Sequence, residues 1–228
     1  MFDLMSYYFP GNGPESWQAL LADPEKQWKV GRSARTLAHC WEGGSGFPPE
    51  VSRVLDESGH QSLSELELVA GFPEHQVPLP GGRRPSQTDV FVLGRNASGL
   101  VAIAVEGKVD EPFGPTVKDW LGTDPSRGKR VRLEYLRDML RIDHDRVGEL
   151  RYQLLHRTAS AAIEAARFGA PTSAMLVHSW AGNQEGFVDY AAFVDALGGE
   201  ASLDGVSGAN VPGLYLGWIR GAQDWLRS

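Results

Sequence analysis

The sequence predicts an α/β protein with a mixed central sheet and helices on both faces of that sheet. Three short segments of β-forming residues follow one another between turn signals in the middle of the chain, which is the pattern of a three-strand antiparallel meander. Helical patterns precede the meander, and a helix, a strand, a second helix and a last strand follow it. This order of elements is typical of a sheet that is covered by helices on both sides.

The N-terminal segment 1–32 is rich in aromatic and loop-forming residues, with a short helix predicted over 15–22. A helix predicted over 33–41 ends at a glycine pair, and Pro48-Pro49 begins the next helix, which extends to about residue 57. The stretch Ser62-Leu-Ser-Glu65 fits a capping box, so a further short helix is expected over the LELVAG that follows it.

The predicted meander has its strands at 75–80, 87–94 and 100–109, joined by the turns GGRRPS and RNASG. Residues 110–128 are expected to form an irregular loop. The elements predicted after that loop are helices over 127–142, 147–169 and 186–198 and strands over 173–180 and 213–221. We expect one domain over 1–228, in which 33–180 forms the core and 181–228 adds the last helix and strand.

Composition excludes several classes of protein. A single cysteine, Cys40, rules out an intrachain disulfide and a zinc site made of cysteines. The N-terminus lacks the basic and apolar regions of a signal peptide, and no apolar run reaches the roughly 18 residues of a membrane helix. We therefore expect a cytoplasmic protein with no membrane partner.

The net charge of −7 is unusual for a nucleic-acid binder, but the charge is unevenly distributed. The segment 127–157 carries nine basic and five acidic residues, which leaves the rest of the chain at −11. This basic segment is either a solvated helical surface or a patch that contacts phosphates beside an acidic pocket.

Charged residues stand near the end of an apolar strand, where their burial needs an explanation. Glu106 and Lys108 are two residues apart, so their side chains project from the same face of the sheet. Asp89 lies in the preceding strand, where it can sit beside Glu106. Two converging carboxylates form an oxygen site suited to Mg2+ or Mn2+, and a nearby lysine can orient water or stabilise charge on a phosphoryl group. The alternative is a self-neutralising ion pair at a strand end.

The stretch TDVFVLGRNASGLVAIAVEGK resembles the D…ExK signature of the restriction-endonuclease-like, or PD-(D/E)XK, nuclease superfamily. The order of elements over 33–180 is similar to the core of that superfamily. The resemblance implies that Asp89 and Glu106 are metal ligands and that Lys108 is the catalytic lysine. The segments VEGKVDEPFGP and RYQLLHRTAS are also similar to an uncharacterised bacterial protein family, which adds no activity.

The chain departs from the superfamily pattern at several positions. Thr88 precedes the aspartate where a proline is usual. Some relatives carry a Q-x-x-x-Y element after the lysine strand; here Gln153 is a candidate catalytic residue and Arg157 stands in place of the tyrosine. Gln153 could equally have a structural role. Many members have a glutamate on the first core helix as an extra metal ligand, for which Glu42 and Glu65 are candidates, although both also fit surface or capping roles.

The resemblance predicts a Mg2+-dependent nuclease that cleaves DNA, in defence or repair, with a homodimer possible for a member of this fold. Candidate nucleic-acid contacts are Arg83, Arg84, Lys129, Arg130 and Arg157. Trp120 either stacks on a base or forms a hydrophobic lid. The alternatives are a catalytically weak or inactive module that binds nucleic acid or protein, and a nuclease that acts on RNA.

Overall fold

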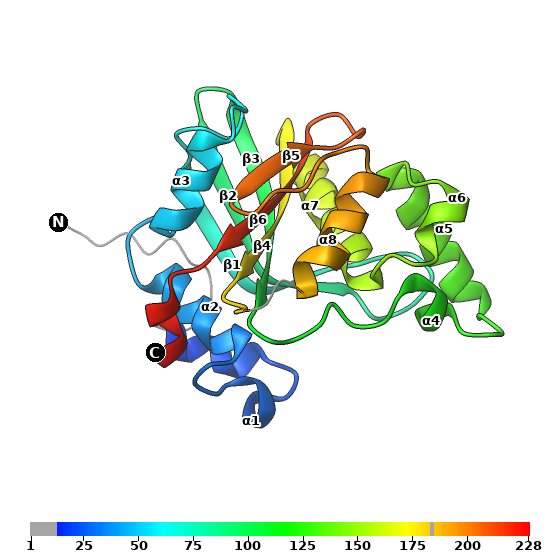
Figure 1. Ribbon diagram of the computed structural model, residues 1–228, viewed down its shortest axis with the longest axis horizontal. Helices are drawn as coiled ribbons and strands as arrows, with labels where there is room; N and C mark the ends of the chain where they lie inside the picture. Colours follow the sequence, from blue (N-terminus) through cyan, green and yellow to red (C-terminus); the bar gives the residue numbers. More distant parts are fainter. Residues whose placement is uncertain (1–12, 183–184) are drawn as a thin grey trace.

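The computed structural model describes residues 13–182 and 185–228 and contains a six-stranded mixed sheet with the strand order β1-β2-β3-β4-β6-β5 (Figure 1). The strands are β1 (Glu67–Val77), β2 (Ser86–Asn96), β3 (Gly99–Lys108), β4 (Thr172–Ser179), β5 (Gly205–Gly208) and β6 (Leu214–Arg220). The first three strands pair antiparallel, β4 lies parallel to both β3 and β6, and β5 adds an antiparallel edge. The predicted α/β class and mixed sheet are confirmed.

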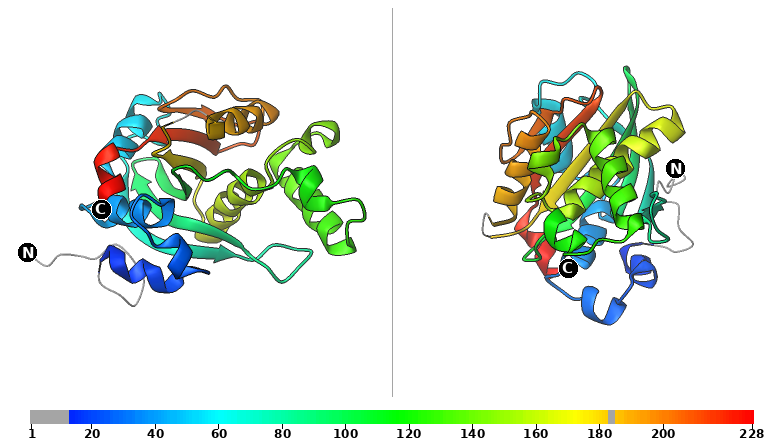
Figure 2. Two further views of the ribbon diagram at one scale, coloured as in Figure 1. Left: turned by 60° about the horizontal axis from the view of Figure 1, so that its bottom comes forward. Right: turned by 90° about the vertical axis from the view of Figure 1, so that its right-hand side faces the viewer.

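Helices cover both faces of this sheet. One face packs against the 3-10 helix η1 (Pro14–Leu20) and against α2 (Ser33–Glu42) and α3 (Pro49–Glu57). The other face packs against α5 (Arg127–Leu140), α7 (Tyr152–Phe168) and α8 (Glu185–Ala196). The short helices are α1 (Pro24–Gln27), α4 (Val117–Leu121), α6 (His144–Val147) and the C-terminal η2 (Gln223–Arg227). Figure 2 shows α5 and α6 at the opposite end of the molecule from η1 and α1.

Burial on both faces explains why the central strand lacks an alternating polar pattern. In β3, Val101, Ile103 and Val105 belong to the core on the α2 side, while Ala102 lies under α7. Small residues on the α7 side let that helix approach the sheet closely. The strand becomes polar only at its end, where Glu106 and Lys108 face the α7 side.

Local patterns misassigned several segments. The helix expected over LELVAG is wrong, because residues Glu67–Val77 form β1, whose pairing with β2 outweighs the local helical pattern. The helix expected over 147–169 begins five residues later, as α7 at Tyr152, and is preceded by the separate short helix α6; an isolated bridge between Thr116 and Arg151 lies between the two helices. The expected loop 110–128 contains α4, and β5 was not predicted.

Within the two described ranges, no helix is both long enough and apolar enough to cross a membrane.

Candidate active site

The sheet brings Asp89, Glu106 and Lys108 together on one face. The antiparallel register pairs Val90 with Val105, and its continuation sets Asp89 opposite Glu106. Residues opposite each other in an antiparallel pair project from the same face, and so does Lys108, two residues after Glu106. Gly107 faces the other way, where a side chain would meet Leu37 of α2 at 3.4 Å. The three predicted residues therefore lie under α7, where the sheet face carries charge.

Glu106 is held by three donors. Its Oε1 accepts hydrogen bonds from Lys108 Nζ at 3.0 Å and from Gln153 Nε2 at 2.6 Å, and its Oε2 accepts from Arg157 Nε at 2.6 Å. Lys108 Nζ also donates to Gln153 Oε1 at 3.2 Å. Because Glu106 is only 3 % exposed, these bonds offset the cost of burying its charge.

The pKa of Glu106 reflects this arrangement. Burial alone would raise the pKa of the carboxyl group, but the adjacent Arg157 and Lys108 outweigh burial and hold the pKa at about 2. Glu106 is therefore a fixed negative charge.

Asp89 is less fully satisfied than Glu106. Its Oδ2 accepts a hydrogen bond from the backbone N–H of Gly107 at 2.9 Å. Among the described residues, its Oδ1 accepts none. Burial and the negative charge of Glu106 raise the pKa of Asp89 to about 7. Asp89 therefore keeps an open acceptor position in a site that favours added positive charge.

Glu74 of β1 is a third acid that sequence reasoning missed. It falls between the register pairs Pro73–Val90 and His75–Thr88, so the three carboxylates form a row across β1, β2 and β3. Gln87 Nε2 donates to Glu74 Oε2 at 2.6 Å, and burial together with the charge of Asp89 raises the pKa of Glu74 to about 8. The strand predicted over 75–80 began eight residues after the true start of β1 and three residues past its true end, so the prediction left Glu74 out.

A cavity of about 320 Å3 contains this row of acids. Its polar wall is formed by Glu74, Gln87, Asp89, Glu106, Lys108, Gln153 and Arg157, and its other wall by Leu21, Ala22, Gln27, Ser33 and Ala34. With all groups ionised, three carboxylates face two cations, which leaves one net negative charge. Carboxylate and amide oxygens are the ligand types that Mg2+ and Mn2+ prefer, and the side chains of Asp89, Glu106 and Gln153 offer such oxygens to this cavity.

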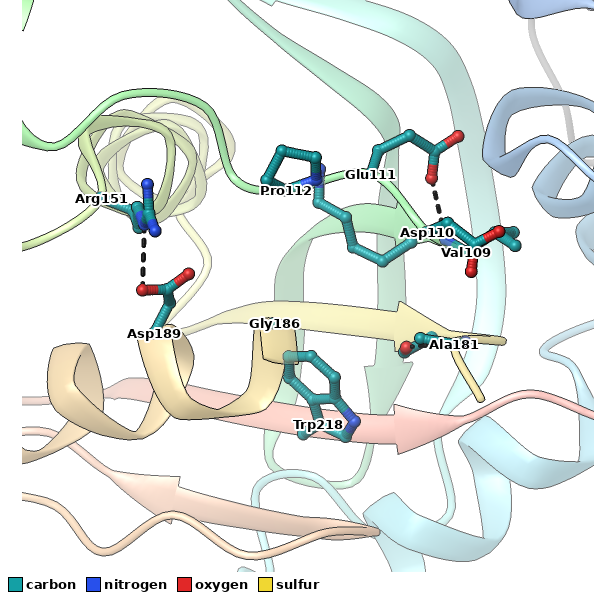
Figure 3. Close-up of a pocket in the computed structure, with 11 residues that line it drawn as sticks. Val109, Asp110, Glu111, Pro112, Arg151, Ala181, Gly186, Asp189 and Trp218 are labelled. Carbon is teal, nitrogen blue, oxygen red and sulfur yellow. Dashed lines mark hydrogen bonds and ion pairs between the residues drawn. The ribbon is translucent and has the colours of Figure 1, made fainter. Parts of the chain in front are cut away.

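Lys108 also borders a second cavity of about 130 Å3 (Figure 3). This cavity lies between the segment 109–112, the first turn of α8 and Trp218 of β6. An ion pair between Arg151 Nε and Asp189 Oδ1 at 2.9 Å forms one side. Lys108 thus lines both the acid-lined cavity and this second cavity, which also contains the ring of Trp218 in its lining.

The two candidates for the extra metal-binding glutamate, Glu42 and Glu65, do not line the acid-lined cavity. Glu42 lies at the end of α2 and accepts a hydrogen bond from Trp17 Nε1 at 2.9 Å. Glu65 is exposed before β1, with a left-handed backbone (φ 53°) and no helix to cap. Glu74, which does line that cavity, belongs to strand β1 and not to a helix.

The predicted nucleic-acid contacts divide into two groups. Arg83 and Arg84 are exposed in the loop between β1 and β2. Lys129 Nζ donates to the carbonyl oxygens of Trp120 and Leu121, and exposed Arg130 pairs with Asp124 at 3.6 Å. Arg157 is buried against Glu106 instead of lying free for a phosphate. Of the five predicted contacts, Arg83 and Arg84 are therefore the two arginines that are exposed and form no ion pair with another described residue.

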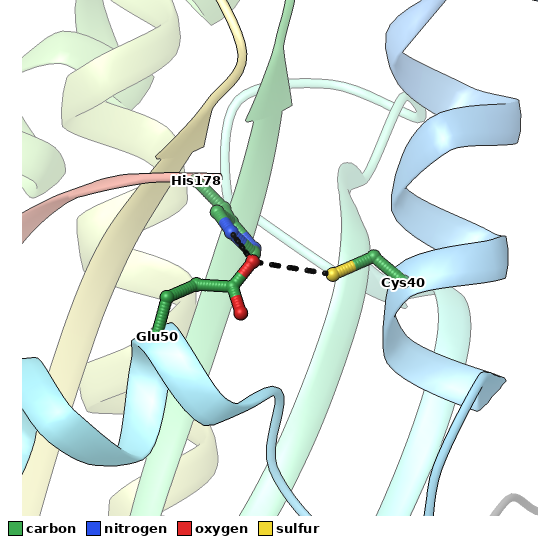
Figure 4. Close-up of side chains that lie close together, drawn as sticks. All are labelled: Cys40, Glu50 and His178. Atoms are coloured by element: carbon green, nitrogen blue, oxygen red, sulfur yellow. Dashed lines mark hydrogen bonds and ion pairs between the residues drawn. The ribbon is translucent and has the colours of Figure 1, made fainter. Parts of the chain in front are cut away.

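Cys40, Glu50 and His178 form a separate cluster on the other face of the sheet (Figure 4). Their potential ligand atoms lie within 4.8 Å of one another. However, Trp41 Nε1 donates to His178 Nδ1 at 3.1 Å, which leaves the proton of the neutral ring on Nε2, facing Glu50. A metal-bound histidine instead donates from its second nitrogen. Burial also raises the pKa of the Cys40 thiol, so this cluster fits a structural link better than a metal site.

Comparison with known proteins gives one match. Residues 10–223 match the model of a family described as a domain of unknown function, DUF6946. No curated protein matches the chain, and no solved structure matches it. Because the match extends over nearly the whole sequence, the chain belongs to the DUF6946 family.

Proposed function

We propose that this protein is a divalent-cation-dependent nuclease that hydrolyses phosphodiester bonds in DNA, built on a restriction-endonuclease-like core. One observation carries the proposal: Asp89, Glu106 and Lys108 project from the same face of neighbouring strands and border one cavity. The order of helix, meander, helix and strand from α2 to β4 supports the same arrangement.

Each residue has a role in this proposal. Asp89, through its open Oδ1, and Glu106 would hold Mg2+ or Mn2+. Such an ion supplies positive charge against the phosphoryl oxygens of the transition state. Lys108 orients a water or donates a hydrogen bond to the developing charge. Gln153 contacts both Lys108 and Glu106 and fixes their relative position, while Arg157 keeps Glu106 ionised.

A second candidate function has its own supporting observation. Lys108, Gln153 and Arg157 already satisfy Glu106, which lowers its need for a metal ion. A site neutralised in this way suits a catalytically inactive family member that binds nucleic acid or protein.

A cleavage assay separates the two functions. Purified protein is incubated with supercoiled plasmid, linear duplex, single-stranded DNA and RNA, with Mg2+, Mn2+ or EDTA. We expect cation-dependent cleavage of DNA by the wild type and a loss of about 100-fold or more in Asp89→Ala and Lys108→Ala. Glu65→Gln is the matched control, because Glu65 is an exposed acid outside the cavity, and it should cleave like the wild type.

Three results would redirect the proposal. Cleavage of RNA but not DNA changes the substrate class. No cleavage of any substrate favours the binding module. Cleavage by Asp89→Ala at the wild-type rate refutes the assignment of Asp89, Glu106 and Lys108 as the active site.

A further inference from the structure

A third cavity, of about 200 Å3, lies beside the first turn of α7 and differs in charge from the acid-lined cavity. It is lined by Leu79, Arg84, Pro85, Ser86, Trp120, Arg132, Tyr152 and His156. The lining includes two arginines and no acid. Its chemistry is therefore that of a site for an anion.

Arg132 gives this cavity a buried positive charge. Its side chain is 8 % exposed, and its guanidinium donates to the carbonyl oxygens of Pro80 at 2.9 Å, Leu79 at 3.2 Å and Gly82 at 3.3 Å. Among the described residues, no carboxylate lies within ion-pair distance of Arg132. A buried charge without a counter-ion favours an anion at the cavity. Exposed Arg84 adds a second cation.

Trp120 and Tyr152 add a flat aromatic surface. Their rings are stacked, with centroids 3.9 Å apart and planes at 7°. Both residues are partly exposed and line the cavity. Lys129 holds the chain at Trp120 by donating to its carbonyl oxygen. Aromatic rings beside arginines form the usual binding surface for an unpaired base and its phosphate.

The two cavities are neighbours along α7 and β2. Tyr152 and His156 of α7 line the cationic cavity, and Gln153 and Arg157 line the acid-lined one. On β2, Ser86 Oγ contacts His156 Nδ1 at 2.8 Å, and Asp89 follows three residues later. Three residues of strand span roughly 10 Å, which is a distance of one or two nucleotides along a strand.

We propose that the cavity of Arg84, Arg132, Trp120 and Tyr152 binds a single-stranded nucleic acid, with a phosphate on the arginines and an unstacked base against the aromatic pair. The delivery of that strand to Asp89 and Glu106 rests on the proposed nuclease function, whereas the binding itself does not. A base inside a duplex is stacked on both sides and cannot enter such a cavity, so the site selects single strands or frayed ends.

The test is binding without divalent cations, so that hydrolysis plays no part. Fluorescence anisotropy measures the affinity for a short fluorescein-labelled oligothymidylate in EDTA at several salt concentrations. We expect Trp120→Ala to weaken binding about tenfold. We expect Arg84→Ala to weaken it and to reduce the slope of log K against log salt by about 0.7.

Arg227→Ala is the matched control, because Arg227 is an exposed arginine of η2 that does not line the cavity and is not among the candidate nucleic-acid contacts. Its affinity should stay close to that of the wild type. Circular dichroism confirms that each variant is folded. Equal effects of Arg227→Ala and Arg84→Ala, unchanged binding by folded Trp120→Ala, or equally tight binding of a blunt duplex would each overturn the assignment.

The design separates this inference from the proposed function. If the variants lose binding but the wild type cleaves nothing, the binding site stands and the nuclease fails. If the wild type cleaves and the variants bind and cleave equally well, the nuclease stands and the binding site is wrong.

Discussion

Replacement of Arg157 tests the electrostatic balance of the acid-lined cavity. Arg157 Nε lies 2.6 Å from Glu106 Oε2, and the side chains of Arg157 and Glu106 are 11 % and 4 % exposed. In Arg157→Gln, Glu106 loses its guanidinium partner but keeps Lys108 and Gln153. The variant therefore leaves a buried carboxylate only partly compensated.

The size of the effect follows from burial. Removing one partner of a buried ion pair costs about 3–5 kcal/mol, and the two remaining donors favour the lower end, about 3 kcal/mol. For a chain of this length, each kcal/mol lowers the melting temperature by about 2–4 °C, so we expect a decrease of about 6–12 °C in EDTA. The freed Oε2 of Glu106 should also strengthen cation binding. A cation at 100 times its Kd adds about 2.7 kcal/mol, so saturating Mg2+ should recover most of the loss.

The assay is urea and thermal unfolding of wild type and variant in EDTA and in MgCl2. Arg130→Gln is the control, because its exposed pair with Asp124 is worth about 0–1 kcal/mol at most. A loss in Arg157→Gln no larger than that of the control would refute the idea that Arg157 holds the charge of Glu106. A loss of 3 kcal/mol that Mg2+ does not reduce would refute the predicted competition between Arg157 and the cation.

Three further predictions follow from the same structure. Burial and Glu106 raise the pKa of Asp89 to about 7, so Asp89→Asn should be at least as stable as the wild type at pH 8 in EDTA. In a thermal-shift assay, Mg2+ should raise the melting temperature of the wild type but not that of Asp89→Asn. An unchanged Mg2+ effect in the variant would exclude Asp89 as a ligand. Burial and Arg157 lower the pKa of His156 to about 3, so the folded protein loses stability as the pH falls from about 6.5, by up to about 1.4 kcal/mol per pH unit. His156→Gln should flatten this slope in urea unfolding between pH 4 and 6, whereas a replacement of exposed His144 by Gln should not. Gly81 has φ +81°, and a side chain there would collide with the carbonyl oxygen of Gly128 in α5. Gly81→Ala should therefore lower the free energy of unfolding by about 1–3 kcal/mol in chemical unfolding, which is more than the loss for Gly114→Ala, where the space is open. Equal losses in the two variants would show that backbone strain alone matters.

The pairing of Asp89 with Glu106 and Lys108 could be predicted because it depends on short-range geometry. The two strands are joined by a tight turn, so their adjacency and register follow from the sequence between them. Alternation along β3 then fixes the face of Glu106 and Lys108. The spacing of Gln153 and Arg157 on one side of a helix is equally local.

Other features depend on contacts between distant segments. Arg157 and Glu106 are 51 residues apart, and nothing in either segment specifies that α7 rests on the end of β3. Whether Arg157 binds a phosphate or a buried carboxylate is decided by that packing. The third acid, Glu74, required the full extent of β1, where pairing with β2 overrides a local pattern that also fits a helix.

The sequence by itself determined the α/β class, the meander and the acids and lysine at its open end, because strand alternation and short turns act over a few residues. Only the tertiary structure decided which groups neutralise those acids, that Glu74 joins them and that a cationic aromatic cavity adjoins them. These features arise when helices and strands far apart in the chain pack together, and their energies depend on burial and on partners that no local pattern records.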